Sequence, residues 1–115
     1  MVIPNLNDAT DYSRFGRVVN PCLPLARIVD EIRISSFVTG TSLHAGILAD
    51  AYGVPNRIAI PASETSLKYE DYYEGTGRKN QALNSVESCV ESGPSAPLEL
   101  ELGTLLNSFP LELWD

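Results

Sequence analysis

Two short polar segments carry side chains that could bind and protonate a small anion. The first is Thr39-Gly40-Thr41-Ser42-Leu43-His44, which follows a short apolar run and precedes a strongly apolar segment. If a helix begins here, its first backbone N–H groups and its dipole favour a phosphate or a carboxylate. A histidine in that first turn can exchange a proton near neutral pH, as a general acid or base must. The structural alternative is a helix capped by Thr41 or Ser42, with His44 as a hydrogen-bonded core residue.

The second segment runs from Ala62 to Tyr73 and contains Lys68. A cation at the start of a helix opposes the helix dipole, so a purely structural reason for Lys68 is weak. If the strands before the two segments are neighbours, Lys68 and His44 face the same crevice, where one would hold an anion while the other moves a proton. The alternative is a solvated surface lysine. Asp50 is no partner for His44, because six helical residues leave the two about 120° apart around the axis.

The elements that position these residues alternate between short apolar runs and segments of helical period. We expect strands near residues 1–4, 17–20, 36–39 and 56–60, and helices near 24–34, 42–52 and 67–75, with a short helical turn near 9–14. This order predicts an α/β fold, a Rossmann-like three-layer αβα domain with a short, mostly parallel sheet. In such sheets the binding crevice lies outside the carboxyl ends of the strands, where both polar segments fall.

The last third of the chain is less regular. Ala82, Val86, Cys89 and Val90 fit one face of a helix, and residues 93–97 form a loop or hinge rich in proline. Beyond them, Leu98–Leu102 alternates like a strand, but the leucines and Phe109 keep a helical spacing for longer. We therefore expect residues 93–115 to form an extension that contains a helix.

Composition excludes several classes of function. The 115 residues carry a formal net charge of −7, and the longest basic run is Arg78-Lys79, which argues against a nucleic-acid partner. No apolar stretch approaches the roughly 18 residues of a membrane span, and the N-terminus lacks a signal-peptide pattern. We expect Cys22 and Cys89 to be reduced, because the chain shows no export signal. With one histidine and no cysteine cluster, we expect a site without a metal.

Several segments together resemble the polysaccharide pyruvyl transferases, in the branch that acts on exopolysaccharides. The stretch Ser36–Pro55 resembles the family's serine-leucine-histidine segment and the Ala-x-Ala-x-Gly-Ile-Pro pattern after it, and Lys68–Tyr73 resembles the block of lysine, aromatic, Asp and Tyr that follows. Phe109–Trp114 resembles the ending of that branch, and Val18–Cys22 fits the strand before its first long helix.

The resemblance implies an activity and an architecture. The family transfers the pyruvyl group of phosphoenolpyruvate onto two hydroxyls of a sugar as a ketal and releases phosphate. It has two Rossmann-like halves, as in GT-B glycosyltransferases, and residues 1–115 match the C-terminal half alone. The implied partners are therefore phosphoenolpyruvate, a sugar or lipid-linked oligosaccharide acceptor, and the N-terminal half, which is absent here. The implied location is the cytoplasm or the inner face of the membrane.

The resemblance also implies roles for individual residues. His44 would be the acid/base or a contact to the donor's phosphate or carboxylate, and Lys68 the cation for the anionic donor. Thr41 and Ser42, with their backbone N–H groups, would bind the anion, and no cofactor beyond phosphoenolpyruvate is implied. Ala45 departs from the family, which usually has Gly or Ser there. Because a cleft enzyme needs both walls, we expect the chain to be inactive alone.

Two other functions stay open on the residues. One is a nucleotide-sugar glycosyltransferase-like domain, in which Glu64 would grip the ribose, although no glycine-rich fingerprint accompanies it. The other is a non-catalytic α/β interaction module that docks a partner through Phe109–Trp114.

Overall fold

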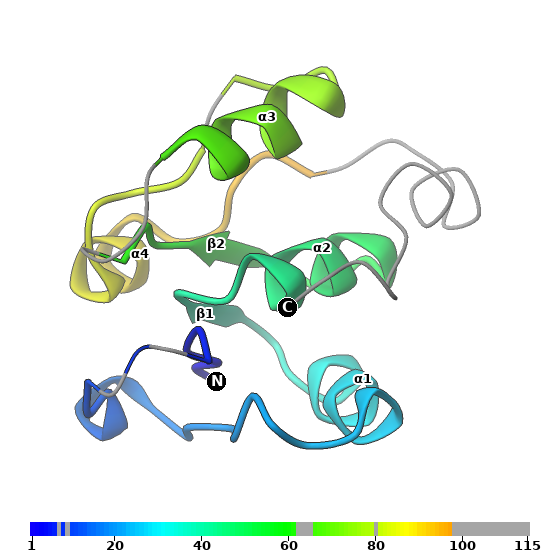
Figure 1. Cartoon of the computed structure of the whole chain (residues 1–115), viewed down its shortest axis with the longest axis vertical. Coiled ribbons are helices and arrows are strands. Elements are labelled where there is room, and N and C mark those ends of the chain that lie inside the picture. The colour runs from blue at the N-terminus through cyan, green and yellow to red at the C-terminus, as the bar shows by residue number, and fades with distance from the viewer. Residues whose placement is uncertain (7, 9, 62–65, 80, 98–115) are drawn as a thin grey trace.

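The computed structural model describes residues 1–6, 8, 10–61, 66–79 and 81–97, which form a mixed α/β fold (Figure 1). The described elements, in chain order, are η1 (Ser13–Phe15, a 3-10 turn), α1 (Leu25–Arg33), β1 (Val38–Gly40), α2 (Leu43–Ala51), β2 (Asn56–Ile58), α3 (Leu67–Gly75) and α4 (Val86–Ser92). The predicted helices near 24–34, 42–52 and 67–75 are confirmed. None of the helices in the described part has the length and apolarity that crossing a bilayer requires.

The strands run parallel, as the sequence predicts. β1 pairs with β2 in the register Val38 to Asn56, Thr39 to Arg57 and Gly40 to Ile58. The strands expected near 1–4 and 17–20 are shorter than predicted, because each pairs through one residue: Val2 forms parallel bridges with both Val18 and Thr39. Proline follows both runs, at positions 4 and 21, and its missing N–H limits how far a ladder can extend. A further parallel bridge joins Ala59 to Leu83.

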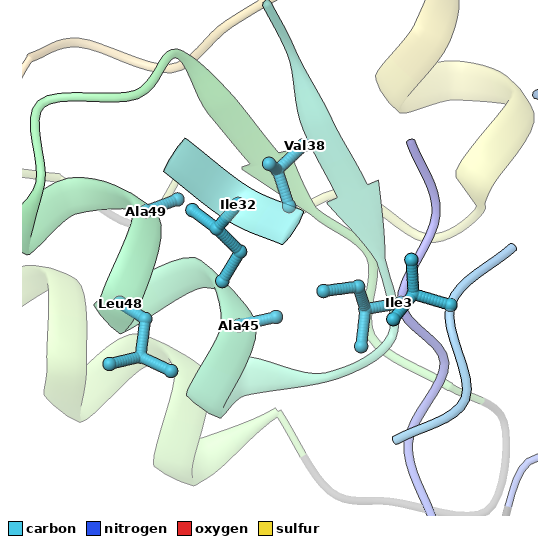
Figure 2. Close-up of a cluster of buried hydrophobic side chains, with 7 residues drawn as sticks. Ile3, Ile32, Val38, Ala45, Leu48 and Ala49 are labelled. Carbon is cyan, nitrogen blue, oxygen red and sulfur yellow. The ribbon is translucent and has the colours of Figure 1, made fainter. Parts of the chain in front are cut away.

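Successive side chains along extended backbone point to opposite faces, and Ile58 and the next residue, Ala59, accordingly belong to different hydrophobic clusters. Val38 packs with Ile32 of α1 and with side chains of α2, and Figure 2 shows Ala45, Leu48 and Ala49 beside them. Ala59, beyond the end of β2, belongs to a separate cluster with Val2 and with Val86 and Cys89 of α4.

Helix α2 is the most enclosed of the described helices, and its buried residues are Leu43, Ala45, Gly46, Ile47, Leu48 and Ala49. Its two faces have different partners. Ala45, Leu48 and Ala49 pack toward α1, whereas Leu43 and Ile47 pack against the tyrosines of α3, and at 100° per residue these two sets lie on opposite sides of the axis. The expectation that so apolar a helix is packed between other elements is confirmed.

Helix α3 contributes three buried tyrosines, Tyr69, Tyr72 and Tyr73, to the cluster with Leu43, Ile47 and Ile58. They fill the space that smaller apolar side chains fill on the α1 side. Helix α4 confirms the helical face expected around residues 82–90, although it begins only at Val86. The predicted helix beyond residue 97, Glu64 and the Phe109–Trp114 segment lie outside the described residues.

Gly40 ends β1 where the backbone of Ile3 crosses it. Its φ is +125°, and a Cβ there would lie 2.2 Å from the Ile3 carbonyl oxygen. Gly53, after α2, also has a positive φ of +70°, but a Cβ there would meet nothing within 4 Å. A side chain at Gly53 would therefore meet backbone strain alone, whereas one at Gly40 would meet both backbone strain and a steric clash.

We expect Gly40→Ala to lower the free energy of unfolding by about 3 kcal/mol or more, since a left-handed backbone and a clash with main chain both penalise the new methyl. Gly53→Ala should cost only about 1–2 kcal/mol, from backbone strain alone. Urea unfolding followed by circular dichroism measures both. Equal losses in the two variants would contradict the close approach of Ile3.

Candidate functional site

A pocket of about 240 Å³ opens at the N-terminus of α2. Its polar lining comes from three separate parts of the chain. Asn5 comes from the N-terminal segment, Ser42 and His44 from the start of α2, and Lys68 from the first turn of α3. Its apolar lining includes Pro21, Leu23, Leu25 and Ile28, from α1 and the segment before it. The pocket therefore reaches from α1 across the start of α2 to α3.

His44 is the second residue of α2 and is half-buried. Around the helix axis it lies between the face that packs toward α1 and the face that packs against α3, and this places its side chain at the pocket. Two features thus meet at this helix start: an imidazole and the positive end of the helix dipole.

Ser42 is the N-cap of α2, and its hydroxyl accepts a hydrogen bond from the Ala45 N–H at 3.2 Å. The capping role considered from the sequence is therefore present. Ser42 also lines the pocket, so its hydroxyl hydrogen can still be donated to a ligand while the oxygen caps the helix.

Lys68 is exposed and lines the same pocket as His44, as the sequence predicts for neighbouring strands. Its Nζ lies 5.5 Å from the centroid of the Tyr69 ring. The Tyr69 hydroxyl donates a hydrogen bond to the Thr41 carbonyl at 3.1 Å, and this bond fixes the first turn of α3 to the junction between β1 and α2. The position of Lys68 relative to His44 is thus set by buried contacts.

The structure does not bring the side chain of Thr41 into the pocket. Thr41 is only 2% exposed. Its hydroxyl donates to Asp8 at 2.6 Å and accepts from the Asn5 N–H at 2.9 Å. Because Asn5 and Leu6 line the pocket, Thr41 positions one rim of it.

Asp8 is the centre of this rim, and the sequence reasoning missed it. It accepts hydrogen bonds from the hydroxyls of Thr41 and Tyr12 and from the Thr10 N–H. Burial raises the pKa of its carboxyl, but these hydrogen bonds outweigh burial and lower the pKa below its ordinary value. The sequence offers one weak signal for Asp8, an acidic residue close to residues with short polar side chains. Because this pattern is common in loops, it does not identify Asp8 as part of a site.

Asp50 lies at the other end of α2, away from His44, as its helical position predicts. Its two oxygens accept hydrogen bonds from Asn56 at 2.7 Å, from the Tyr72 hydroxyl at 2.5 Å and from Arg78 at 2.9 Å. The side chains of Arg78 and Asp50 are 8% and 4% exposed, respectively. Arg78, part of the longest basic run of the sequence, is therefore a buried partner of Asp50.

The network around Arg78 organises the loop that follows α4. Arg78 also donates to the Ala96 carbonyl at 3.0 Å, and its guanidinium carbon lies 4.8 Å from the centroid of the Tyr73 ring. The Ser95 N–H and hydroxyl both donate to the Asn56 carbonyl. We therefore assign this region to structure and the pocket at the start of α2 to candidate function.

Within the described part of the chain, no group of three or more His, Cys, Asp or Glu side chains could hold a metal ion. Cys22 is exposed and Cys89 is buried, and the two are not joined. Burial raises the pKa of the Cys89 thiol. What the pocket offers chemically is one imidazole, one primary ammonium and a helix start, opposite an aliphatic wall.

The comparisons with known proteins add no family to this picture: no protein-family model matches the chain, and neither does a curated protein or a solved structure.

We expect Arg78→Ala to lower the free energy of unfolding by about 3–5 kcal/mol, because it leaves the Asp50 carboxylate buried without its cation. The matched control is Lys79→Ala, which removes the same charge from an exposed neighbour and should stay within about 0.5 kcal/mol of the wild type. Urea unfolding checks both. An Arg78→Ala protein as stable as the Lys79→Ala protein would show that the ion pair is not buried.

We also expect stability to fall at alkaline pH. Burial, with the nearby Asp50 carboxylate, raises the pKa of Tyr73 from 10.0 to about 12, and the pKa of Tyr72 is raised for the same reasons. Because the pKa of Tyr73 is higher in the folded chain than in the unfolded chain, its contribution to the free energy of unfolding is complete below pH 10 and is lost as pH rises toward 12. Urea midpoints measured across this range should show a smaller loss for Tyr73→Phe than for wild type, whereas Tyr52→Phe, at an exposed position, should follow wild type.

Proposed function

We propose that the chain is the C-terminal half of a polysaccharide pyruvyl transferase and that its pocket binds phosphoenolpyruvate. The observation that carries the proposal is that His44 and Lys68, from the two segments that resemble the family, line one pocket at a helix start. The proposal includes the finer architecture, a three-layer αβα Rossmann-like domain that forms one half of a GT-B-like enzyme. It also includes a cytoplasmic location, or one at the inner face of the membrane.

The arrangement of charge supports an anionic ligand. Phosphoenolpyruvate carries a phosphate and a carboxylate, and either can be placed between the Lys68 ammonium and the start of α2. A lysine in the first turn of α3 opposes that helix's own dipole, and an anion in the pocket offsets the repulsion.

The reaction assigns His44 a proton. When ketal formation begins, the methylene carbon of phosphoenolpyruvate gains a proton and the neighbouring carbon becomes electrophilic. Two sugar hydroxyls add to that carbon and the C–O bond to phosphate breaks. Of the two hydroxyl protons, one balances the proton gained by the methyl group and the other leaves with phosphate. His44 is the titratable group at the pocket suited to carry the first, and Ser42 and Lys68 hold the donor.

The partners follow from the proposal. The acceptor is a sugar or a lipid-linked oligosaccharide, and the N-terminal half of the enzyme supplies the second wall of the cleft. Thr41 enters the proposal only as the residue that positions Asn5, since its hydroxyl is engaged with Asp8. Ala45, beside His44 and buried, narrows the space next to the imidazole.

We expect the chain to bind phosphoenolpyruvate, with amide shifts at the starts of α2 and α3 in an NMR titration. His44→Ala and Lys68→Ala should each weaken binding about tenfold, the loss of one interaction with a charged group. Lys79→Ala removes an equal charge away from the pocket and should bind like wild type. The chain alone should release no phosphate from phosphoenolpyruvate in the presence of an acceptor.

Three results would each contradict the proposal. Tighter binding of a uridine diphosphate sugar than of phosphoenolpyruvate would favour the glycosyltransferase-like alternative. If His44→Ala and Lys68→Ala both bound phosphoenolpyruvate as tightly as wild type, the ligand would not bind in this pocket. Turnover by the chain alone would contradict the half-site arrangement.

A further inference from the structure

The pocket at the start of α2 has two unlike walls. On the α3 side it presents Lys68, and at its centre His44 and Ser42. On the α1 side its lining is aliphatic, from Leu23, Leu25 and Ile28. Helices α1 and α3 lie on opposite sides of α2 (Figure 1). The Lys68 wall and the aliphatic wall of the pocket therefore lie on opposite sides of it.

The aliphatic wall is not closed by the protein. Leu25 is 46% exposed and Leu6, on the rim, is 51% exposed, although both line a concave surface. Exposed leucines in a pocket keep apolar surface in water, and each square ångström that a ligand covers contributes about 25 cal/mol. A ligand that fills only the polar side would leave this surface exposed.

We propose that the pocket binds an acidic amphiphile, a phosphate or carboxylate that bears a short aliphatic group, with the acid between His44 and Lys68 and the aliphatic group against Leu23, Leu25 and Ile28. This inference rests on the proposed function in one respect, the anion site at His44 and Lys68, and adds a second requirement for the ligand. The methylene group of phosphoenolpyruvate is small and covers only a little of this aliphatic wall. A larger apolar group on the same acid fills the pocket better.

The charge of the surroundings favours this orientation. The positive end of the α2 dipole acts at the centre of the pocket and the Lys68 ammonium acts on its α3 side, so the acid is attracted there and not toward α1. A reversed ligand would bury its acid against leucines without a hydrogen bond, which is costly.

The test compares the affinities of inorganic phosphate, n-butyl phosphate and phosphoenolpyruvate for the full chain by NMR titration. Each buried methylene is expected to improve affinity about fourfold, so n-butyl phosphate should bind at least tenfold more tightly than inorganic phosphate. Leu25→Asn should remove most of this gain and leave inorganic phosphate unaffected. Because Leu25 is half-exposed, the variant should fold, and circular dichroism checks that it does.

The matched control is Ile34→Asn. Ile34 is 77% exposed, follows α1 directly and does not line the pocket, so this variant should keep the full gain of n-butyl phosphate. Lys68→Ala should weaken both phosphates by the same factor, because it acts on the acid alone.

The outcomes separate the two proposals. Equal affinities for inorganic and n-butyl phosphate, or a gain that Leu25→Asn leaves intact, would overturn the amphiphile inference while phosphoenolpyruvate binding still stands. Tight n-butyl phosphate binding without phosphoenolpyruvate binding would support the inference and overturn the pyruvyl transferase proposal. Failure of all three ligands to bind would overturn both.

Discussion

The close packing of α2 on the strands is the constraint on which the rest of the structure depends. A Cβ at Gly46 would lie 2.5 Å from Cγ1 of Ile58, so the helix approaches β2 as closely as a glycine allows. With one face of α2 held against β2, α1 and α3 pack on two other faces of the helix. Each of those helices brings one wall to the pocket, and α2 brings its N-terminus. The candidate site therefore follows directly from how one apolar helix is buried.

The two ends of α2 have different roles. At its start, Ser42 caps the helix and His44 faces a pocket that is open to solvent. At its end, Asp50 is buried and fully engaged by Asn56, Tyr72 and Arg78. These contacts to Asp50 hold one end of the helix in place, and this allows the other end to present polar groups with a defined geometry, as a binding site requires.

Much of this arrangement could be predicted from the sequence, because it depends on local pattern. The caps and apolar spacing predicted the helices at α1, α2 and α3, and the position of His44 in the first turn followed from them. What could not be predicted depends on contacts between distant residues. Thr41 pairs with Asp8, 33 residues away, and Arg78 with Asp50, 28 residues away. No periodicity links such pairs, so the sequence predicts Thr41 as a ligand of the anion and gives no sign that Arg78 pairs with Asp50. The strands near residues 1–4 and 17–20 were predicted too long because apolar runs do not reveal how many ladder hydrogen bonds form.

The ionic network around Asp50 also has a consequence for the order of folding. It joins α2 to Arg78, and Arg78 to Ala96, 18 residues further along the chain. Closing loops of this length costs entropy that the contacts repay only once they are complete. The network should therefore be absent from the folding transition state and form after α2 has docked on the strands. Interactions of that kind slow unfolding without speeding folding, so we expect this buried carboxylate to affect how long the native chain persists more than how fast it is reached.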